Sequence, residues 1–308
     1  MSVTSARTAA ARRPWADALL AWYFVAVWGT GYVATKVALQ YAAPFTFLSL
    51  RYAFGLLCLA PVLLALRPRW PASRAELMHL VVAGLLMHAV QLGGSHYAQY
   101  LGMSAGIAAL IISVQPLATA VIASRWMGER LLARQWLGVA IGLSGIALVV
   151  WHKIDIRDIG LASLAATCIA LAGITAGTLY QRVFCPRTDL MSAAFIQFAA
   201  SLAVLAPLGA VIEGFRVVWA WQLLAATAFL VILASILAVN VLHTLMRHGE
   251  ATRVTSMMYL PPIFAVAVEY AMFEVVPTAL SFLGIAVTCT GVALTAWKSA
   301  RAPSAAVD

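Results

Sequence analysis

The stretch that decides the fold covers residues 77–124, LMHLVVAGLLMHAVQLGGSHYAQYLGMSAGIAALIISVQPLATAVIAS, which contain no Asp, Glu, Lys or Arg. A helix that crosses a membrane needs about 20 mostly apolar residues, because the hydrocarbon core is about 30 Å thick and each residue rises about 1.5 Å. The stretch is therefore long enough for two membrane-spanning helices. We expect it to divide near Gln99–Ser104, where Gly102 and Ser104 favour a tight turn.

The rest of the chain follows the same pattern. Of the 308 residues, 63% are hydrophobic and 10% are charged, and the mean hydropathy is +0.93. A soluble domain has about 45–50% apolar and about 25% charged residues, so an ordinary soluble enzyme, a nucleic-acid-binding domain and a disordered chain are excluded. Further apolar stretches, of which the second tolerates Arg51, cover residues 18–35, 44–66, 135–152, 159–181, 190–212, 217–246, 253–273 and 275–297. The sequence thus predicts ten transmembrane helices.

The basic residues indicate how these helices are oriented. The net charge is +9, and cytoplasmic loops of membrane proteins are enriched in Lys and Arg. With a cytoplasmic N-terminus, fifteen of the 20 Lys and Arg residues fall in inner segments. Four fall in outer loops, and these are Lys36, Lys153, Arg157 and Arg216. Both termini are therefore expected in the cytoplasm.

Neither the N-terminal stretch nor the cysteines indicate a cleaved signal, a disulfide or a metal site. Arg12-Arg13 before an apolar stretch resembles a secretory signal, but no small-residue cleavage site follows, so we interpret this stretch as an uncleaved first helix. The four cysteines lack a C-x-x-C spacing. We expect no disulfide framework, no metal site and no cofactor.

An internal repeat is detectable at an offset of 146 residues. The offset aligns Gly and Pro pairs and one Trp pair, namely Gly31 with Gly177, Pro61 with Pro207, Pro116 with Pro262, Gly138 with Gly284, Gly145 with Gly291 and Trp151 with Trp297. Five helices is an odd number, so the second copy enters the membrane inverted, as in many secondary transporters. The expected organisation is a cytoplasmic tail 1–14, a first five-helix repeat 15–152, a second, inverted repeat 153–298, and a cytoplasmic tail 299–308.

Two motifs of the first half carry a family resemblance. One is Trp28-Gly29-Thr30-Gly31-Tyr32-Val33-Ala34-Thr35-Lys36; the other comprises Gln115-Pro116-Leu117, Gly128-Glu129-Arg130 and Gln135-Trp136-Leu137-Gly138. They resemble the EamA family of the drug/metabolite transporter superfamily, whose repeat opens with W-G-x-x-x-x-x-x-K and closes with a P…G-E-R…Q-W-x-G pattern. The second half keeps only Pro262, Glu274 (one residue out of register), Gly284 and Gly291. Within the family, the chain is most similar to bacterial aromatic amino-acid exporters.

The resemblance implies a non-enzymatic, multi-pass transporter of the bacterial inner membrane. It implies export of amino acids, aromatic and others, with broad specificity and by alternating access. Its expected partners are a small-molecule substrate and the lipid bilayer, without nucleic acid and without a required oligomer. Because the same family fold serves several substrate classes, drugs or other small metabolites such as nucleotide sugars remain alternatives.

A non-transport membrane enzyme or assembly subunit is the remaining alternative. It would need a catalytic cluster at one membrane face, and His152 with Asp155 and Asp158 is too ordinary a loop to provide one. The G-x-G-x-x-A pattern at residues 29–34 fits a dinucleotide fingerprint only after a strand, and it lies within an apolar span. We interpret its glycines as allowing close helix packing, as expected also for Gly102/Gly106, Gly138/Gly142 and Gly173/Gly177.

Polar and aromatic side chains within the spans are the candidates for a substrate cavity. Polar groups in hydrocarbon are costly, so they face a cavity or a helix interface. The candidates are Trp28, Tyr32, His88, Gln91, Ser95, Ser113, Gln115, Thr175, Tyr180, Asn240, His243 and Tyr259. Arg51, whose repeat partner is Gln197, either forms a structural bond or contacts substrate.

Three prolines suggest how the helices move. Pro116 and the Pro261-Pro262 pair interrupt backbone hydrogen bonding at matching points of the two halves, so we expect them to be gating hinges. Only one acidic residue, Glu269, lies inside a span, near its outer end. Ion-driven carriers usually place a carboxylate deep in the bundle, so we expect a uniporter or facilitator.

Overall fold

The computed structural model describes residues 14–128, 131–155, 160–237, 241 and 260–296. All regular secondary structure in this described part is helical, and strand pairing is limited to an isolated bridge between Ala42 and Val217. The first half contains α1 (Pro14–Ala38), α2 (Pro44–Leu66), α3 (Arg74–Gly84), the π-helix η1 (Leu85–Val90), α4 (Gln91–Tyr100), α5 (Ala105–Ile112), α6 (Gln115–Trp126) and α7 (Ala133–Asp155). The second half contains α8 (Leu161–Phe184), α9 (Leu190–Glu213), α10 (Trp221–Ala228), the π-helix η2 (Phe229–Leu237), α13 (Pro261–Phe273) and α14 (Ala279–Ala296).

Five helical segments are long and apolar enough to cross a membrane: Pro44–Leu66, Arg74–Tyr100, Ala105–Trp126, Leu161–Phe184 and Leu190–Glu213. Four shorter apolar helices accompany them in the described residues: Ala133–Val149, Trp221–Ser235, Pro261–Phe273 and Ala279–Thr295. The chain is thus a multi-pass membrane protein, as its composition predicted, and its described elements are helices.

The division of the long uncharged stretch is confirmed. The helix that ends at Tyr100 and the helix that begins at Ala105 are separated by a turn in which Gly102 has a φ of +98°, a left-handed conformation that glycine adopts without strain. The hydroxyl of Ser104 then accepts the backbone N–H of Ile107 and so caps α5.

Helix boundaries recur at the offset that the sequence repeat gave. Adding 146 to the first residues of α2, α6 and α7 (44, 115 and 133) gives 190, 261 and 279, which are the first residues of α9, α13 and α14. The same addition moves η1 from 85–90 to 231–236, inside η2. The two halves therefore share these helix starts and a π-helical segment at the matching position.

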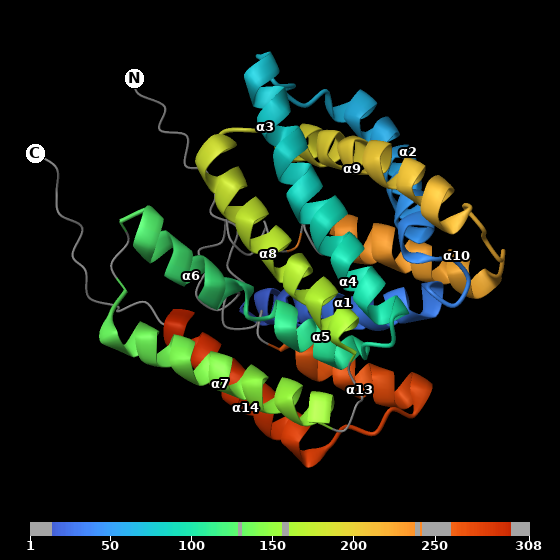
Figure 1. The fold of residues 1–308 in the computed structure, drawn as a ribbon. Coiled ribbons are helices and arrows are strands. Elements are labelled where there is room, and N and C mark those ends of the chain that lie inside the picture. Colours follow the sequence, from blue (N-terminus) through green and yellow to red (C-terminus); the bar gives the residue numbers. More distant parts are fainter. Residues whose placement is uncertain (1–13, 129–130, 156–159, 238–240, 242–259, 297–308) are drawn as a thin grey trace, which may run out of the picture.

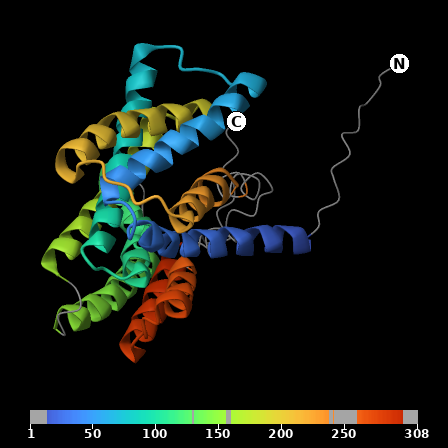
Figure 2. The same cartoon turned by 90° about the vertical axis from the view of Figure 1, so that its right-hand side faces the viewer.

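The helices form a bundle in which α1 is central (Figure 1). In Figure 2, α1 lies between α2 and α9 above and α13 and α14 below. Along its length α1 contacts α13, α5, α10 and η2, so the first helix of one half packs mainly on the second half. The pair formed by α7 and α14 lies side by side at one edge of the bundle (Figure 1).

Small residues permit the closest helix contacts. A Cβ on Gly291 of α14 would lie 2.2 Å from the backbone nitrogen of Gly142 on α7, so these helices meet backbone to backbone. Gly173 and Gly177 pack against η1, and Gly29 packs against Pro261 and Phe264 of α13. The expectation of close packing is thus confirmed at these glycines and at Gly138 and Gly106, whereas for Gly102 it is wrong, because that residue forms the turn before α5.

Candidate functional site

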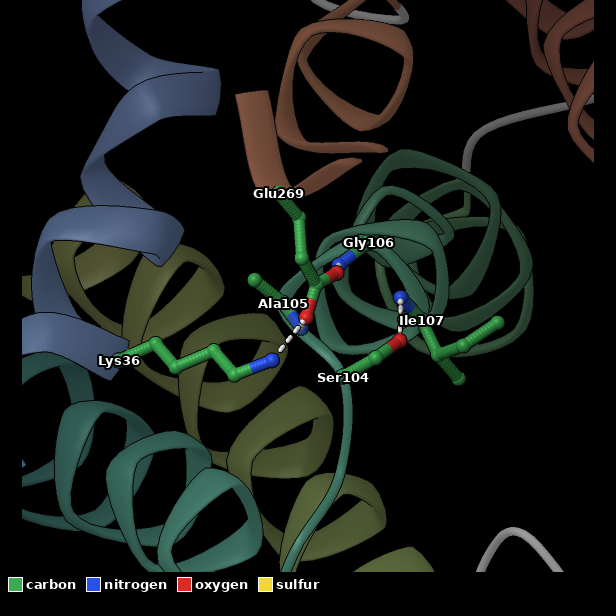
Figure 3. Close-up of polar contacts among 6 residues, drawn as sticks. All are labelled: Lys36, Ser104, Ala105, Gly106, Ile107 and Glu269. Atoms are coloured by element: carbon green, nitrogen blue, oxygen red, sulfur yellow. Dashed lines mark hydrogen bonds and ion pairs between the residues drawn. The ribbon is translucent and has the colours of Figure 1, made fainter. Parts of the chain in front are cut away.

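An ion pair joins three helices at the end of the bundle where α1 ends, which the charge distribution predicts to be the outer end. The Lys36 ammonium, in the last turn of α1, lies 2.7 Å from Oε1 of Glu269 on α13. The backbone N–H groups of Ala105 and Gly106 each donate to the same carboxylate at 2.9 Å. Figure 3 shows Glu269 pointing at the first turn of α5 while Lys36 reaches it from α1.

Burial makes this contact energetically important. The Glu269 side chain is 3% exposed and that of Lys36 is 27% exposed. The carboxylate satisfies two N–H groups at the start of a helix, where the helix dipole favours a negative charge. The Lys36 ammonium also lies 4.6 Å from the centre of the Phe273 ring, a cation–π contact. A cavity of about 230 Å³ adjoins the pair and is lined in part by Ser104 and Ser281.

Sequence reasoning missed this pairing. It placed Lys36 in an outer loop and Glu269 near the outer end of a span, but 233 residues separate the two. Lys36 in fact belongs to the last turn of α1. The available signal was that Glu269 is the lone acidic residue within the spans predicted from the sequence, together with the Lys that closes the W-G-x-x-x-x-x-x-K motif.

A second carboxylate links two helices at the same end of the bundle. Glu213, the last residue of α9, accepts the backbone N–H groups of Phe45 and Thr46 at 3.0 and 2.7 Å, and also the Thr46 hydroxyl at 2.7 Å. Nearby, the Val218 N–H donates to the Tyr41 carbonyl at 2.8 Å. The ends of α1, α2, α5, α9 and α13 are thus joined by polar contacts between the halves.

A second group of polar residues, the central polar cluster, lies within the spans. It comprises Arg51, His88, Gln181, Gln197 and Ser235 on α2, η1, α8, α9 and η2. Arg51 donates from Nη2 to Ser235 Oγ at 3.1 Å, and Gln197 Nε2 donates to Gln181 Oε1 at 3.1 Å. His88 Nε2 lies 3.3 Å from Gln197 Oε1. The repeat partners Arg51 and Gln197 are therefore both in this cluster.

The two π-helices, which match at the repeat offset, each supply one cluster member, although His88 and Ser235 are one residue out of register. His88 lies in η1, and its ring packs edge-on against Tyr52 and Phe198, with centroids 5.9 and 5.1 Å apart. Ser235 lies in η2 and donates to the Leu230 carbonyl at 2.9 Å, five residues earlier. Single π-turns within helices occur frequently at functional sites, so both segments mark the cluster as a candidate substrate region.

Two further polar side chains of α4 were not anticipated. His96 is 2% exposed and Gln99 is 7% exposed. Neither the ring nitrogens of His96 nor the amide atoms of Gln99 have a hydrogen-bond partner in the described part of the chain. The His96 ring stacks on Phe47 of α2, with centroids 5.8 Å apart. Gln99 extends the predicted stripe of His88, Gln91 and Ser95 by one turn.

The other predicted cavity residues fall into three groups. Gln91 and Ser95 are buried on α4, between η1 and His96. Tyr32 is partly buried against the apolar cluster that contains Ile107, and Trp28 is 38% exposed. The remaining described candidates have polar partners, and these are Ser113 (Leu110 carbonyl), Gln115 (Thr119 and Thr178), Thr175 (Leu171 carbonyl) and Tyr180 (His79). Asn240, His243 and Tyr259 lie outside the described residues, as does Glu129 of the second motif.

The predicted hinges coincide with helix starts. The helix that begins at Ala105 stops at Ile112, and α6 begins at Gln115, so Pro116 is its second residue. Pro261 and Pro262 are the first two residues of α13. Proline is favoured there because the first turn of a helix does not need its N–H. Both prolines of α13 are buried.

Comparisons with known proteins agree on one family. A model of the EamA-like transporter family matches residues 16–151 and again residues 159–297. A "Probable amino-acid metabolite efflux pump" of Escherichia coli (strain K12) is 23% identical over 89% of this chain and 93% of its own length. An "Uncharacterized inner membrane transporter YedA" of the same strain is 29% identical over 82% of this chain and 81% of its own length. A crystal structure matches with a TM-score of 0.63 at 17% identity, covering 92% of this chain and 98% of that one, which shows the shared fold.

Proposed function

This chain belongs to the EamA-like transporter family, and from this premise we propose that it exports amino acids, aromatic ones included, across the bacterial inner membrane. The observation that carries the proposal is the central polar cluster, which lies among aromatic rings on helices of both halves. A site with apolar walls and a few polar groups suits a small amphipathic metabolite. The names of the efflux-pump and inner-membrane relatives support the substrate class and the location.

We further propose that the two halves are inverted repeats of five transmembrane helices each, with both termini in the cytoplasm. The matching helix boundaries at an offset of 146 residues support this organisation. The excess of Lys and Arg in the inner segments supports the orientation. Alternating access then follows when the two halves exchange conformations around the central polar cluster.

Transport by a uniporter fits the observation that Glu269 and Glu213 are already bound by groups of the protein. Glu269 and Glu213 each hold a helix start, and Glu269 also neutralises Lys36. Neither is a free carboxylate beside the central polar cluster. We therefore propose export down the concentration gradient of an accumulated metabolite. Accumulation driven by a pH gradient alone would contradict this coupling.

A flux assay tests the function directly. The purified protein in proteoliposomes is given phenylalanine, threonine, a cationic dye or a nucleotide sugar, with protein-free liposomes as the control. We expect phenylalanine and threonine flux, and little flux of the nucleotide sugar, because a diphosphate needs several cations and the cluster contains one arginine. Flux of the dye or the nucleotide sugar without flux of either amino acid would contradict the proposed substrate class.

The proline hinges provide a test of the mechanism. Pro116→Ala and Pro262→Ala allow more regular backbone bonding at the starts of α6 and α13. We expect both variants to change the initial rate of phenylalanine flux far more than the amount of protein in the membrane. Unchanged rates in both variants would exclude these prolines as hinges.

A further inference from the structure

We propose that Arg51 and His96 together bind the carboxylate of the transported substrate. The inference rests on the proposed transport function and names the chemical group that the site recognises. It follows from two polar side chains inside the spans whose hydrogen-bonding capacity the protein itself leaves largely unused.

Arg51 is a cation without a counter-ion in the described part of the chain. Its guanidinium has five N–H donors, and its one recorded hydrogen bond goes to the neutral hydroxyl of Ser235. The ion pair within the described residues is Lys36–Glu269, so no carboxylate of this part neutralises Arg51. A charge within a membrane span is costly unless it has a partner, and such residues mark substrate pathways. An anionic substrate group would provide that partner.

His96 lies beside the face of α2 that presents Arg51. Phe47 precedes Arg51 by four residues, so both side chains lie on one face of the helix. The His96 ring stacks on Phe47, and both of its nitrogens lack a partner in the described residues although the side chain is 2% exposed. A buried polar group without a partner lowers the stability of the folded protein. A ligand that accepts the imidazole N–H would remove this cost.

The number of charges favours a carboxylate over a phosphate. One guanidinium binds a carboxylate through two parallel N–H bonds and matches its single negative charge. A dianionic phosphate or a diphosphate would need additional cations, and Lys36 is already paired with Glu269. Apolar rings lie close to Arg51 along the chain and across the helix contact, since Tyr52 is the next residue and packs on Phe198 with ring centroids 5.2 Å apart. The site therefore fits an apolar amino acid held by its carboxylate.

The experiment compares phenylalanine with phenylalaninamide, which lacks the carboxylate. Flux of both is measured in proteoliposomes for the wild type, Arg51→Gln, Arg51→Lys and His96→Asn. Arg74→Gln is the matched control, because Arg74 is an exposed residue at the start of α3. We expect Arg51→Gln to lower phenylalanine flux at least about tenfold, since a hydrogen bond to a charged group is lost, and to change amide flux less than about threefold. We expect Arg51→Lys and His96→Asn to give intermediate losses.

Binding in detergent, measured as the rise in melting temperature on adding phenylalanine, separates this inference from the proposed function. We expect phenylalanine to stabilise the wild type and Arg74→Gln but not Arg51→Gln. If phenylalanine binds in this way without any flux, the transport proposal fails and the carboxylate site stands. Equal binding of the amide by the wild type, equal loss of acid and amide in the stably folded Arg51 variants, or no stabilisation by phenylalanine would overturn the inference.

Discussion

Replacing Glu269 with alanine is expected to lower the rate of amino-acid transport by more than about tenfold and to destabilise the purified protein. The substitution leaves the Lys36 ammonium without its counter-ion and the N–H groups of Ala105 and Gly106 without an acceptor. Removing one partner of a buried ion pair costs about 3–5 kcal/mol, and the partial exposure of Lys36 reduces this to roughly 2–3 kcal/mol. A free-energy change of that size between two conformations alters the ratio of their populations by more than a factor of ten.

The measurements are initial flux in proteoliposomes and the fraction of monodisperse protein after heating. Glu274→Gln, an exposed carboxylate five residues later, is the matched control and is expected to change both values little. The double variant Lys36→Met/Glu269→Gln removes both charges, so it is expected to be more stable than Glu269→Ala. Wild-type flux and stability in Glu269→Ala would show that the ion pair contributes to neither.

Gly291→Ala is expected to give the largest loss of stability among single substitutions in the described helices of the α7–α14 pair. The added Cβ would lie 2.2 Å from the Gly142 nitrogen and 2.5 Å from the Gly138 carbonyl oxygen, and these are backbone atoms that cannot rotate away. Helices in a membrane are held together by close packing rather than by a hydrophobic effect between them. Separating α7 from α14 is therefore expected to cost about 3 kcal/mol, the upper end of the range for overpacked cores.

The test is expression followed by thermal stability in detergent. Gly160→Ala is the control, because the nearest atom to its Cβ would be Ser163 Oγ at 4.0 Å. We expect Gly160→Ala to behave like the wild type and Gly291→Ala to yield little monodisperse protein. Similar melting curves for the two variants would contradict the backbone-to-backbone contact.

Local features of the sequence predicted the membrane class, the division at Gly102 and the break before Pro116, because each depends on a few neighbouring residues. The repeat offset extended this to helix boundaries in the second half, such as the start of α13 at Pro261. Hydropathy and glycine spacing also identified Gly138 and Gly142 as a packing surface. These predictions needed no knowledge of which helices are neighbours.

The polar contacts between distant helices were not predictable in this way. Lys36 with Glu269, and Arg51 with Ser235, are separated by 233 and 184 residues, and no periodicity within one helix specifies such pairs. Sequence reasoning identified His88 but had no means to select Gln197 as its neighbour among the polar residues of the second half. It also treated Thr175 as a cavity candidate, whereas the hydroxyl donates to its own helix. Any threonine in a transmembrane helix can make such a hydrogen bond to a carbonyl of its own helix.

Because of the π-helices, some parts of the spans should tolerate the deletion of one residue better than others. A π-turn closes its hydrogen bonds over five residues instead of four, so the segment Leu85–Val90 carries an extra residue relative to a regular α-helix. Deleting one residue there would leave a shorter, continuous α-helix with its flanking faces in register. The same deletion in α9 would rotate all that follows by about 100°. Natural or engineered single-residue deletions should therefore be tolerated for folding at η1 and η2, and they would convert each wide turn into an ordinary one.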